Sequence, residues 1–158
     1  MGTFLVWVHL LAAIAWVGGM AFLSLVLVPV LKQEPFAAQR GLLIKTAAGR
    51  FRAVVWGAIA VLLLTGPVLM QQRGIAITDL SAWPPVLALK LGLVTVLLFS
   101  TLTHDLILGP LVGRLMQLPE EKRTGLDQAL VRWSPWVARL SLLLALAVLF
   151  AAVSLART

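Results

Sequence analysis

The two histidines, His9 and His104, are the side chains of this sequence best suited to hold a metal or exchange protons. Both lie inside long apolar stretches, and His9 belongs to WVHLLAAIAWVGGMAFLSLVLVPVL, residues 7–31. Ionisable side chains in such stretches are costly and usually serve a function. At a rise of about 1.5 Å per residue, the two histidines differ in membrane depth by about 20 Å. They therefore cannot share one metal ion or one haem iron within a single chain.

His9, Met70 and Lys90 are predicted to share a layer near one surface of the membrane. His9 lies roughly 8 Å into the first apolar stretch, Lys90 lies at a similar distance into the third, and Met70 ends the second. Haem iron is commonly held by His alone or by His with Met, and imidazole also suits copper. We expect a metal or haem site in this layer, with His9 as a ligand and Met70 or Lys90 as the second.

The helical face of His9 also carries Trp16 and several small residues, among them Ala12 and Gly19. Small residues on a transmembrane face mark close helix contact, and glycines here would leave room for a flat macrocycle. Arg73 and Arg157 lie beyond the layer and could pair with haem propionates. The alternative interpretation is an interfacial belt, because histidine, lysine and tryptophan are all common at the lipid–water boundary.

A second polar cluster is predicted toward the opposite surface. It comprises His104 and Asp105, with Arg50 and Arg52 at a comparable depth on a neighbouring stretch. Lys90 and His104 fall on one helical face at 100° per residue. The cluster is either a functional site or a plain ion-pair network.

The elements that must position these residues are four apolar stretches, at about 4–31, 51–70, 85–111 and 130–156. Each is long enough to cross a hydrocarbon core of about 30 Å as a helix. Of the 158 residues, 61% are hydrophobic and 12% are charged, which is typical of a membrane protein and not of a soluble domain. We expect an all-α integral membrane four-helix bundle that forms a single domain over residues 1–158. The middle of the first connection, PFAAQRGLLIK, is expected to form a short interfacial helix.

The basic residues predict the orientation. Most of them fall in the first and third connections, and the positive-inside bias makes that side cytoplasmic. Both termini are then on the outer, periplasmic side of a bacterial cytoplasmic (inner) membrane. The same bias explains the net charge of +7, so we expect the lipid bilayer as partner and no nucleic acid. The absence of cysteine excludes thiolate ligands and disulfides.

Three stretches resemble a known family. WVHLLAAIAWVGGM, with its H-x6-W-x-G-G pattern, resembles the first helix of the CopD-type copper-resistance membrane domain. RFRAVVWGAIAVLLLTG and ALKLGLVTVLLFSTLTHDLILGPLV resemble the two helices that follow in that domain. The His-to-Trp spacing and Lys90 are also similar to HemJ-type proteins, which are linked to protoporphyrinogen oxidation and haem b. That similarity implies roles for His9 and Lys90 in haem binding.

These observations predict haem b bound through His9 in the outer half of the bundle, with a role in redox chemistry or electron transfer. The partner would be a quinone or a redox protein, and a homo-oligomer is compatible with the sequence. The alternatives are copper binding, transport or resistance, HemJ-like protoporphyrinogen oxidation, and a structural subunit of a larger membrane complex. Any enzymatic activity would be that of an oxidoreductase.

Overall fold

The structure, a computed structural model, describes residues 2–36 and 39–157. Four of its helical segments are long and apolar enough to cross a membrane: Gly2–Leu31, Arg40–Gln72, Pro85–Leu115 and Gly125–Ala156. No strand occurs in the residues that the structure describes. The predicted all-α fold with four membrane-spanning helices is confirmed. The chain is a multi-pass membrane protein.

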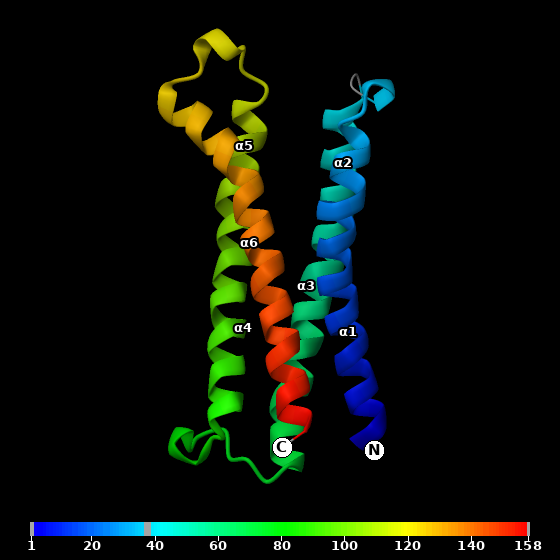
Figure 1. The fold of residues 1–158 in the computed structure, drawn as a ribbon, viewed down its shortest axis with the longest axis vertical. Coiled ribbons are helices and arrows are strands. Elements are labelled where there is room, and N and C mark those ends of the chain that lie inside the picture. The colour runs from blue at the N-terminus through cyan, green and yellow to red at the C-terminus, as the bar shows by residue number, and fades with distance from the viewer. Residues whose placement is uncertain (1, 37–38, 158) are drawn as a thin grey trace. The chain divides into compact units, whose positions relative to one another are not determined.

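Contacts divide the chain into two compact units, Met1–Pro84 and Pro85–Thr158. In the first unit, α1 (Gly2–Phe22), a π-turn η1 (Leu23–Leu27) and α2 (Val28–Leu31) form one continuous span. It packs against α3 (Arg40–Gln72) as an antiparallel hairpin (Figure 1). Small and branched side chains of α3 are buried in this hairpin: Val55, Ala58 and Ile59. Such residues let the two helix backbones approach closely.

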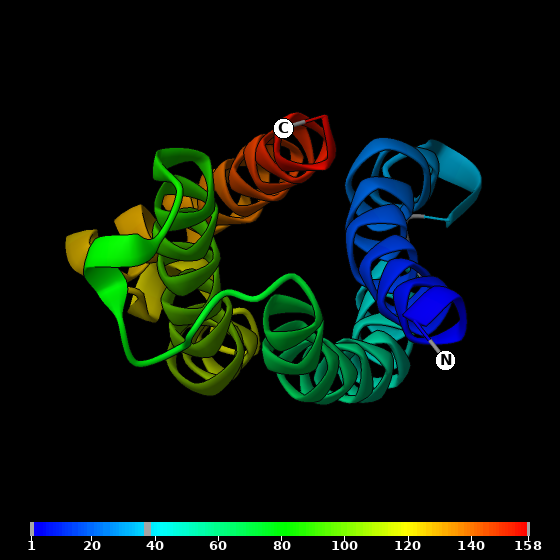
Figure 2. The same cartoon turned by 90° about the horizontal axis from the view of Figure 1, so that it is seen from below.

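The second unit repeats this arrangement. Its first span is α4 (Pro85–Thr103), the π-turn η4 (His104–Leu108) and α5 (Gly109–Leu115), and its second span is α6 (Gly125–Ala156). α4 and α6 lie side by side along their length, as both views show (Figures 1 and 2). Leu97 of α4 and Ala145 of α6 are almost wholly buried.

Both π-turns precede a proline by the same distance. η1 is followed by Val28 and Pro29, and η4 by Gly109 and Pro110. A proline has no N–H to donate, and its ring collides with the carbonyl four residues earlier in a regular α-helix. In membranes a local π-turn relieves this conflict and keeps the remaining backbone groups bonded. Each of the two turns thus accommodates the proline that follows it, whereas α3 and α6 run through Pro67 and Pro135 as α-helix.

An arginine from each connection closes the end of the preceding span. Arg40 Nε donates to the Leu31 carbonyl oxygen at 2.8 Å, and Arg123 Nε donates to that of Leu115 at 2.9 Å. The last carbonyls of a helix have no partner within the helix, and a cation also favours the negative end of the helix dipole. Two of the basic residues in these connections thus act as helix caps.

Side chains also cap the starts of α6 and of the 3-10 turn Leu80–Ala82. The Thr124 hydroxyl accepts from the Asp127 N–H, and the Asp127 carboxylate accepts from the Thr124 N–H, which forms a capping box at the start of α6. In the second connection, the Asp79 carboxylate accepts from the Ser81 hydroxyl and from the N–H groups of Ser81 and Ala82. These bonds, above all that from the Ser81 hydroxyl, lower the pKa of Asp79.

The predicted bounds of the second, third and fourth spans need correction. The fourth span begins at Gly125, five residues before its predicted start. The second span begins at Arg40 and not near residue 51, because the segment Gly41–Arg50 continues directly into the apolar part of α3. The expected interfacial helix is therefore not separate. Glu34–Phe36 forms a 3-10 turn, residues 37–38 lie outside the described residues, and Arg40 onward already belongs to α3. The third span extends to Leu115, four residues beyond the predicted end.

Candidate functional site

His9 of α1 is held by a hydroxyl from α3. Its Nδ1 lies 2.6 Å from Oγ1 of Thr65, which is buried. Thr65 Oγ1 in turn lies 2.7 Å from the carbonyl oxygen of Val61, one turn earlier in α3. A side chain of one helix is thus tied to the backbone of the other through a single hydroxyl.

This chain of contacts determines which nitrogen of the His9 ring carries the proton. A carbonyl oxygen only accepts, so the Thr65 hydroxyl donates its one proton to Val61. In the contact with His9, the Thr65 oxygen must then accept and Nδ1 must donate. When His9 is neutral, Nε2 carries the lone pair. Metal-ligating histidines show the same arrangement, because their second ring nitrogen usually donates to a neighbouring oxygen.

The α1–α3 register places Thr65 and Gly66, and not Met70, opposite His9. A Cβ on Gly66 would lie 3.8 Å from His9 Cε1, and one on Gly2 would lie 3.3 Å from Gln72 Oε1. Met70 is five residues beyond Thr65, about 7.5 Å along the helix axis. It ends α3, where its carbonyl oxygen accepts from the N–H groups of Arg73 and Ile75. The structure brings Thr65 to His9 and leaves Met70 at the helix end.

Trp16 of α1 is buried, with 4% of its surface exposed. Its indole Nε1 is the one buried side-chain nitrogen or oxygen, among the residues described, that has no hydrogen-bond partner. A buried donor without an acceptor costs roughly 1–3 kcal/mol. Trp16 lies two turns from His9 on α1, so an acceptor group of a bound molecule would satisfy this N–H.

The expected room beside the glycine pair is partly filled. A Cβ on Gly19 would overlap the Phe51 ring of α3, whereas Gly18 has no heavy atom within 4 Å of that position. Gly19 therefore serves close packing of α1 on α3, and the Phe51 ring fills the room that was expected beside this glycine.

Lys90 and Arg157, which were expected beside His9, belong to the second unit. Lys90 is half-buried on α4, and Arg157 is the residue that ends α6. Arg73 ends α3 in the first unit and is exposed. His9 and Lys90 hold corresponding positions within their hairpins, because each precedes the π-turn of its span by 14 residues.

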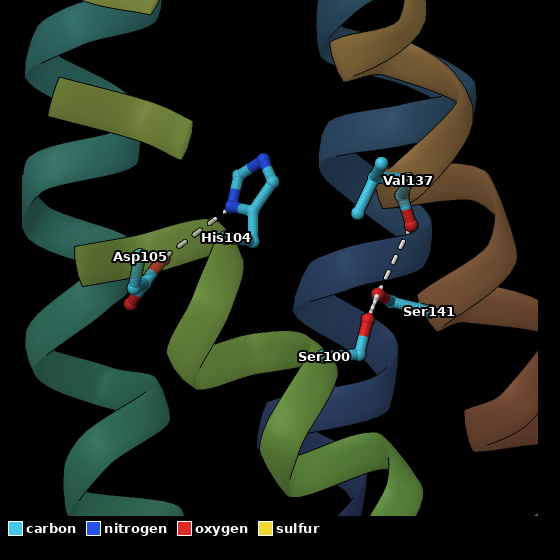
Figure 3. Close-up of polar contacts among 5 residues, drawn as sticks. All are labelled: Ser100, His104, Asp105, Val137 and Ser141. Atoms are coloured by element: carbon cyan, nitrogen blue, oxygen red, sulfur yellow. Dashed lines mark hydrogen bonds and ion pairs between the residues drawn. The ribbon is translucent and has the colours of Figure 1, made fainter. Parts of the chain in front are cut away.

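The second predicted cluster centres on η4. His104 Nδ1 lies 3.5 Å from Asp105 Oδ1 (Figure 3). One turn earlier, the Ser100 hydroxyl lies 2.8 Å from that of Ser141 on α6, and Ser141 donates to the Val137 carbonyl oxygen. Ser100 must therefore donate to Ser141. Arg50 and Arg52, the other expected members, are exposed on α3 of the first unit.

Sequence reasoning missed the role of Thr65. Thr65 precedes Gly66 and Pro67, and α3 continues through this run to Gln72. The signal was present, since Thr65 is a lone hydroxyl within an apolar span at the depth of His9. No group of three or more His, Cys, Asp or Glu side chains in the described part of the chain is placed to hold a metal ion.

Residues 11–121 match a family described as "Domain of unknown function (DUF4149)", and this match covers more than half of the chain. The chain belongs to the DUF4149 family. The match begins two residues after His9 and includes Trp16, Thr65, His104 and Asp105.

A relative from Aquifex aeolicus (strain VF5), called "Uncharacterized protein", is 29% identical over 150 residues. The alignment covers 90% of this DUF4149 chain and 86% of the relative. No solved structure matches the chain.

Proposed function

We propose that His9 is the axial ligand of a b-type haem in the first hairpin, and that the protein transfers electrons within a bacterial cytoplasmic membrane. The observation that carries this proposal is the His9–Thr65–Val61 chain of hydrogen bonds. It keeps the proton on Nδ1 and orients the ring, so that Nε2 is the nitrogen that would bind iron. Histidine ligands from bundle helices are a usual way of holding haem.

Two further features support the proposal. The Nε1–H of Trp16 needs an acceptor, which a polar edge of the bound group would supply. Because residue 66 is a glycine, no side chain at this position of α3 covers the His9 ring. A bound haem would supply a reversible one-electron couple, while the chain supplies the ligand, its orientation and an apolar surrounding that excludes water.

The absorption spectrum of the purified protein tests the proposal. After expression with haem supplied, we expect a Soret band and b-type bands on reduction. His9→Ala should abolish or shift these bands, whereas His104→Ala should leave them unchanged. A spectrum without a Soret band would refute haem binding.

Copper is the second candidate, because a neutral imidazole with an oriented ring also suits copper. Metal analysis of the same preparation separates the two. Bound copper that is lost in His9→Ala, with no Soret band, would assign the site to copper. Neither haem nor copper in the wild-type protein would refute a metal role for His9.

A further inference from the structure

The turn η4 places two ionisable side chains inside a membrane span. The span Pro85–Leu115 has 31 residues, or about 46 Å at 1.5 Å per residue, against a hydrocarbon core of about 30 Å. His104 lies 11 residues before the end of the span, about 16 Å from it. His104 and Asp105 are therefore within the apolar region and not at a helix end.

Folding of the turn does not require these side chains. The turn η1 in the first hairpin has the same length and the same distance to its proline, and it consists of LSLVL. Leu23 and Ser24 stand there at the positions that His104 and Asp105 occupy in η4. Because η1 forms the same turn before a proline without an ionisable side chain, the ionisable pair of η4 needs another explanation.

The pair is turned away from the outward-facing surface of its span. Side-chain exposure is 36% for His104 and 18% for Asp105, whereas the next two residues, Leu106 and Ile107, are exposed at 62% and 59%. His104 continues the face of α4 that carries the buried Leu97 and Thr101. Figure 3 shows the imidazole beside the Asp105 carboxylate, one turn from the Ser100–Ser141 hydrogen bond.

The charge of the pair depends on one proton. A neutral imidazole beside a carboxylate carries one negative charge in total. Addition of a proton to Nδ1, which lies 3.5 Å from Asp105 Oδ1, gives an imidazolium–carboxylate pair with no net charge. The Asp105 carboxylate thus places an opposite charge beside a proton that the imidazole takes up at Nδ1.

Other charged groups lie on the elements that pack against η4. These are Arg114 on α5 and Asp127, Arg132 and Arg139 on α6. The three arginines are exposed, and Arg139 lies 4.7 Å over the Trp136 ring. Asp127 caps the start of α6. Asp105 is the charged group whose carboxylate lies beside the His104 ring, at 3.5 Å.

We propose that His104 and Asp105 form a binding site for one exchangeable proton within the membrane. The proton is held at His104 Nδ1 and stabilised by the Asp105 carboxylate. The π-turn places both side chains on the less exposed side of the span. This site does not depend on the proposed role of His9.

Nitrogen NMR of the full chain in lipid nanodiscs, with ring-labelled histidine, tests the proposal. The His104 signal is identified by its loss in His104→Gln. We expect it to titrate in the wild-type protein, and Asp105→Asn to weaken proton binding at His104 by about tenfold or more, the effect of removing an adjacent opposite charge. Thr103→Val, an isosteric change of an exposed neighbour, should leave the affinity unchanged.

A His104 ring that keeps one protonation state between about pH 4 and pH 10 would overturn the proposal, since this range spans ordinary histidine titration. A titration curve in Asp105→Asn that superimposes on the wild-type curve would also overturn it. Infrared spectra of the wild-type protein provide a test without the Asn variant. An aspartate carboxylate band should shift at the pH at which His104 titrates, and this shift should be lost in His104→Gln.

Discussion

Thr65 has one hydroxyl proton, and its position decides which nitrogen of His9 can bind a ligand. The hydroxyl donates to Val61 and accepts from His9 Nδ1, at distances of 2.7 and 2.6 Å. A rotated Thr65 would reverse the tautomer and place the lone pair on Nδ1. The chemistry proposed for His9 therefore depends on a residue that contacts no ligand itself.

Replacement of Thr65 by valine should weaken the proposed haem site. Valine has nearly the same shape but neither donates nor accepts, so the His9 ring loses its orienting partner. Losses of such supporting bonds typically lower metal affinity by about 10–100-fold. Haem titration of the apoprotein measures this change.

Thr65→Ser is the matched control because it keeps the hydroxyl, and its affinity should stay closer to that of the wild type. Equal haem affinity in Thr65→Val and the wild type would contradict the orienting role.

At the residue scale, the sequence provided candidate side chains but not which of them meet. His9 was identified because an ionisable group in an apolar span is conspicuous. Its contact with Thr65 depends on the register between α1 and α3, which the pattern of apolar residues within each span does not encode. For the same reason Met70 was expected level with His9, while the structure places it one to two turns beyond Thr65.

At the scale of elements, the packing of α1 on α3 is tightest where Gly19 meets Phe51. Gly19→Ala would place a methyl group within the Phe51 ring, so the ring or the helix must shift. Such overpacking usually costs about 1–3 kcal/mol in the free energy of unfolding. Denaturation in mild detergent, followed by tryptophan fluorescence, should show this loss.

Gly18→Ala is the control on the neighbouring position. No heavy atom lies within 4 Å of its added methyl group, and alanine favours a helix over glycine. We expect this variant to be as stable as the wild type or slightly more stable. Equal destabilisation by both changes would show that the contact with Phe51 is not the cause.

The four helices could be predicted from the sequence, whereas their internal irregularities could not. Apolar length alone identifies a membrane span, since every backbone group in lipid must bond within its own helix. The π-turns η1 and η4 carry no such signal, because LSLVL and HDLIL read as ordinary helix. The start of α3 was also misplaced, since a helix that leaves the membrane loses its apolar pattern without ending.

At the scale of the whole molecule, charge predicts the orientation. The first and third connections hold most of the basic residues, and the second holds few. Because Arg40 and Arg123 cap the spans that precede them, these two also have a structural role. The remaining basic side chains still favour the cytoplasmic side for both connections.

The natural absence of cysteine makes this orientation directly measurable. Thr78→Cys, exposed in the second connection, should react with a membrane-impermeant maleimide added to intact spheroplasts. Gln117→Cys, exposed in the third connection, should react only after the membrane is opened. The reverse pattern would invert the predicted topology and place both termini in the cytoplasm.

Each π-turn holds one residue more than a regular α-helix of the same rise would need. Loss of a single residue elsewhere in a span would rotate everything beyond it by about 100° and move buried side chains to the lipid. Loss of one residue within Leu23–Leu27 would instead convert the turn to regular helix and leave both flanking segments facing as they do. The proline conflict that the turn relieves would then return as a kink at Pro29. The two turns are thus the places where each hairpin can change its length without losing its register.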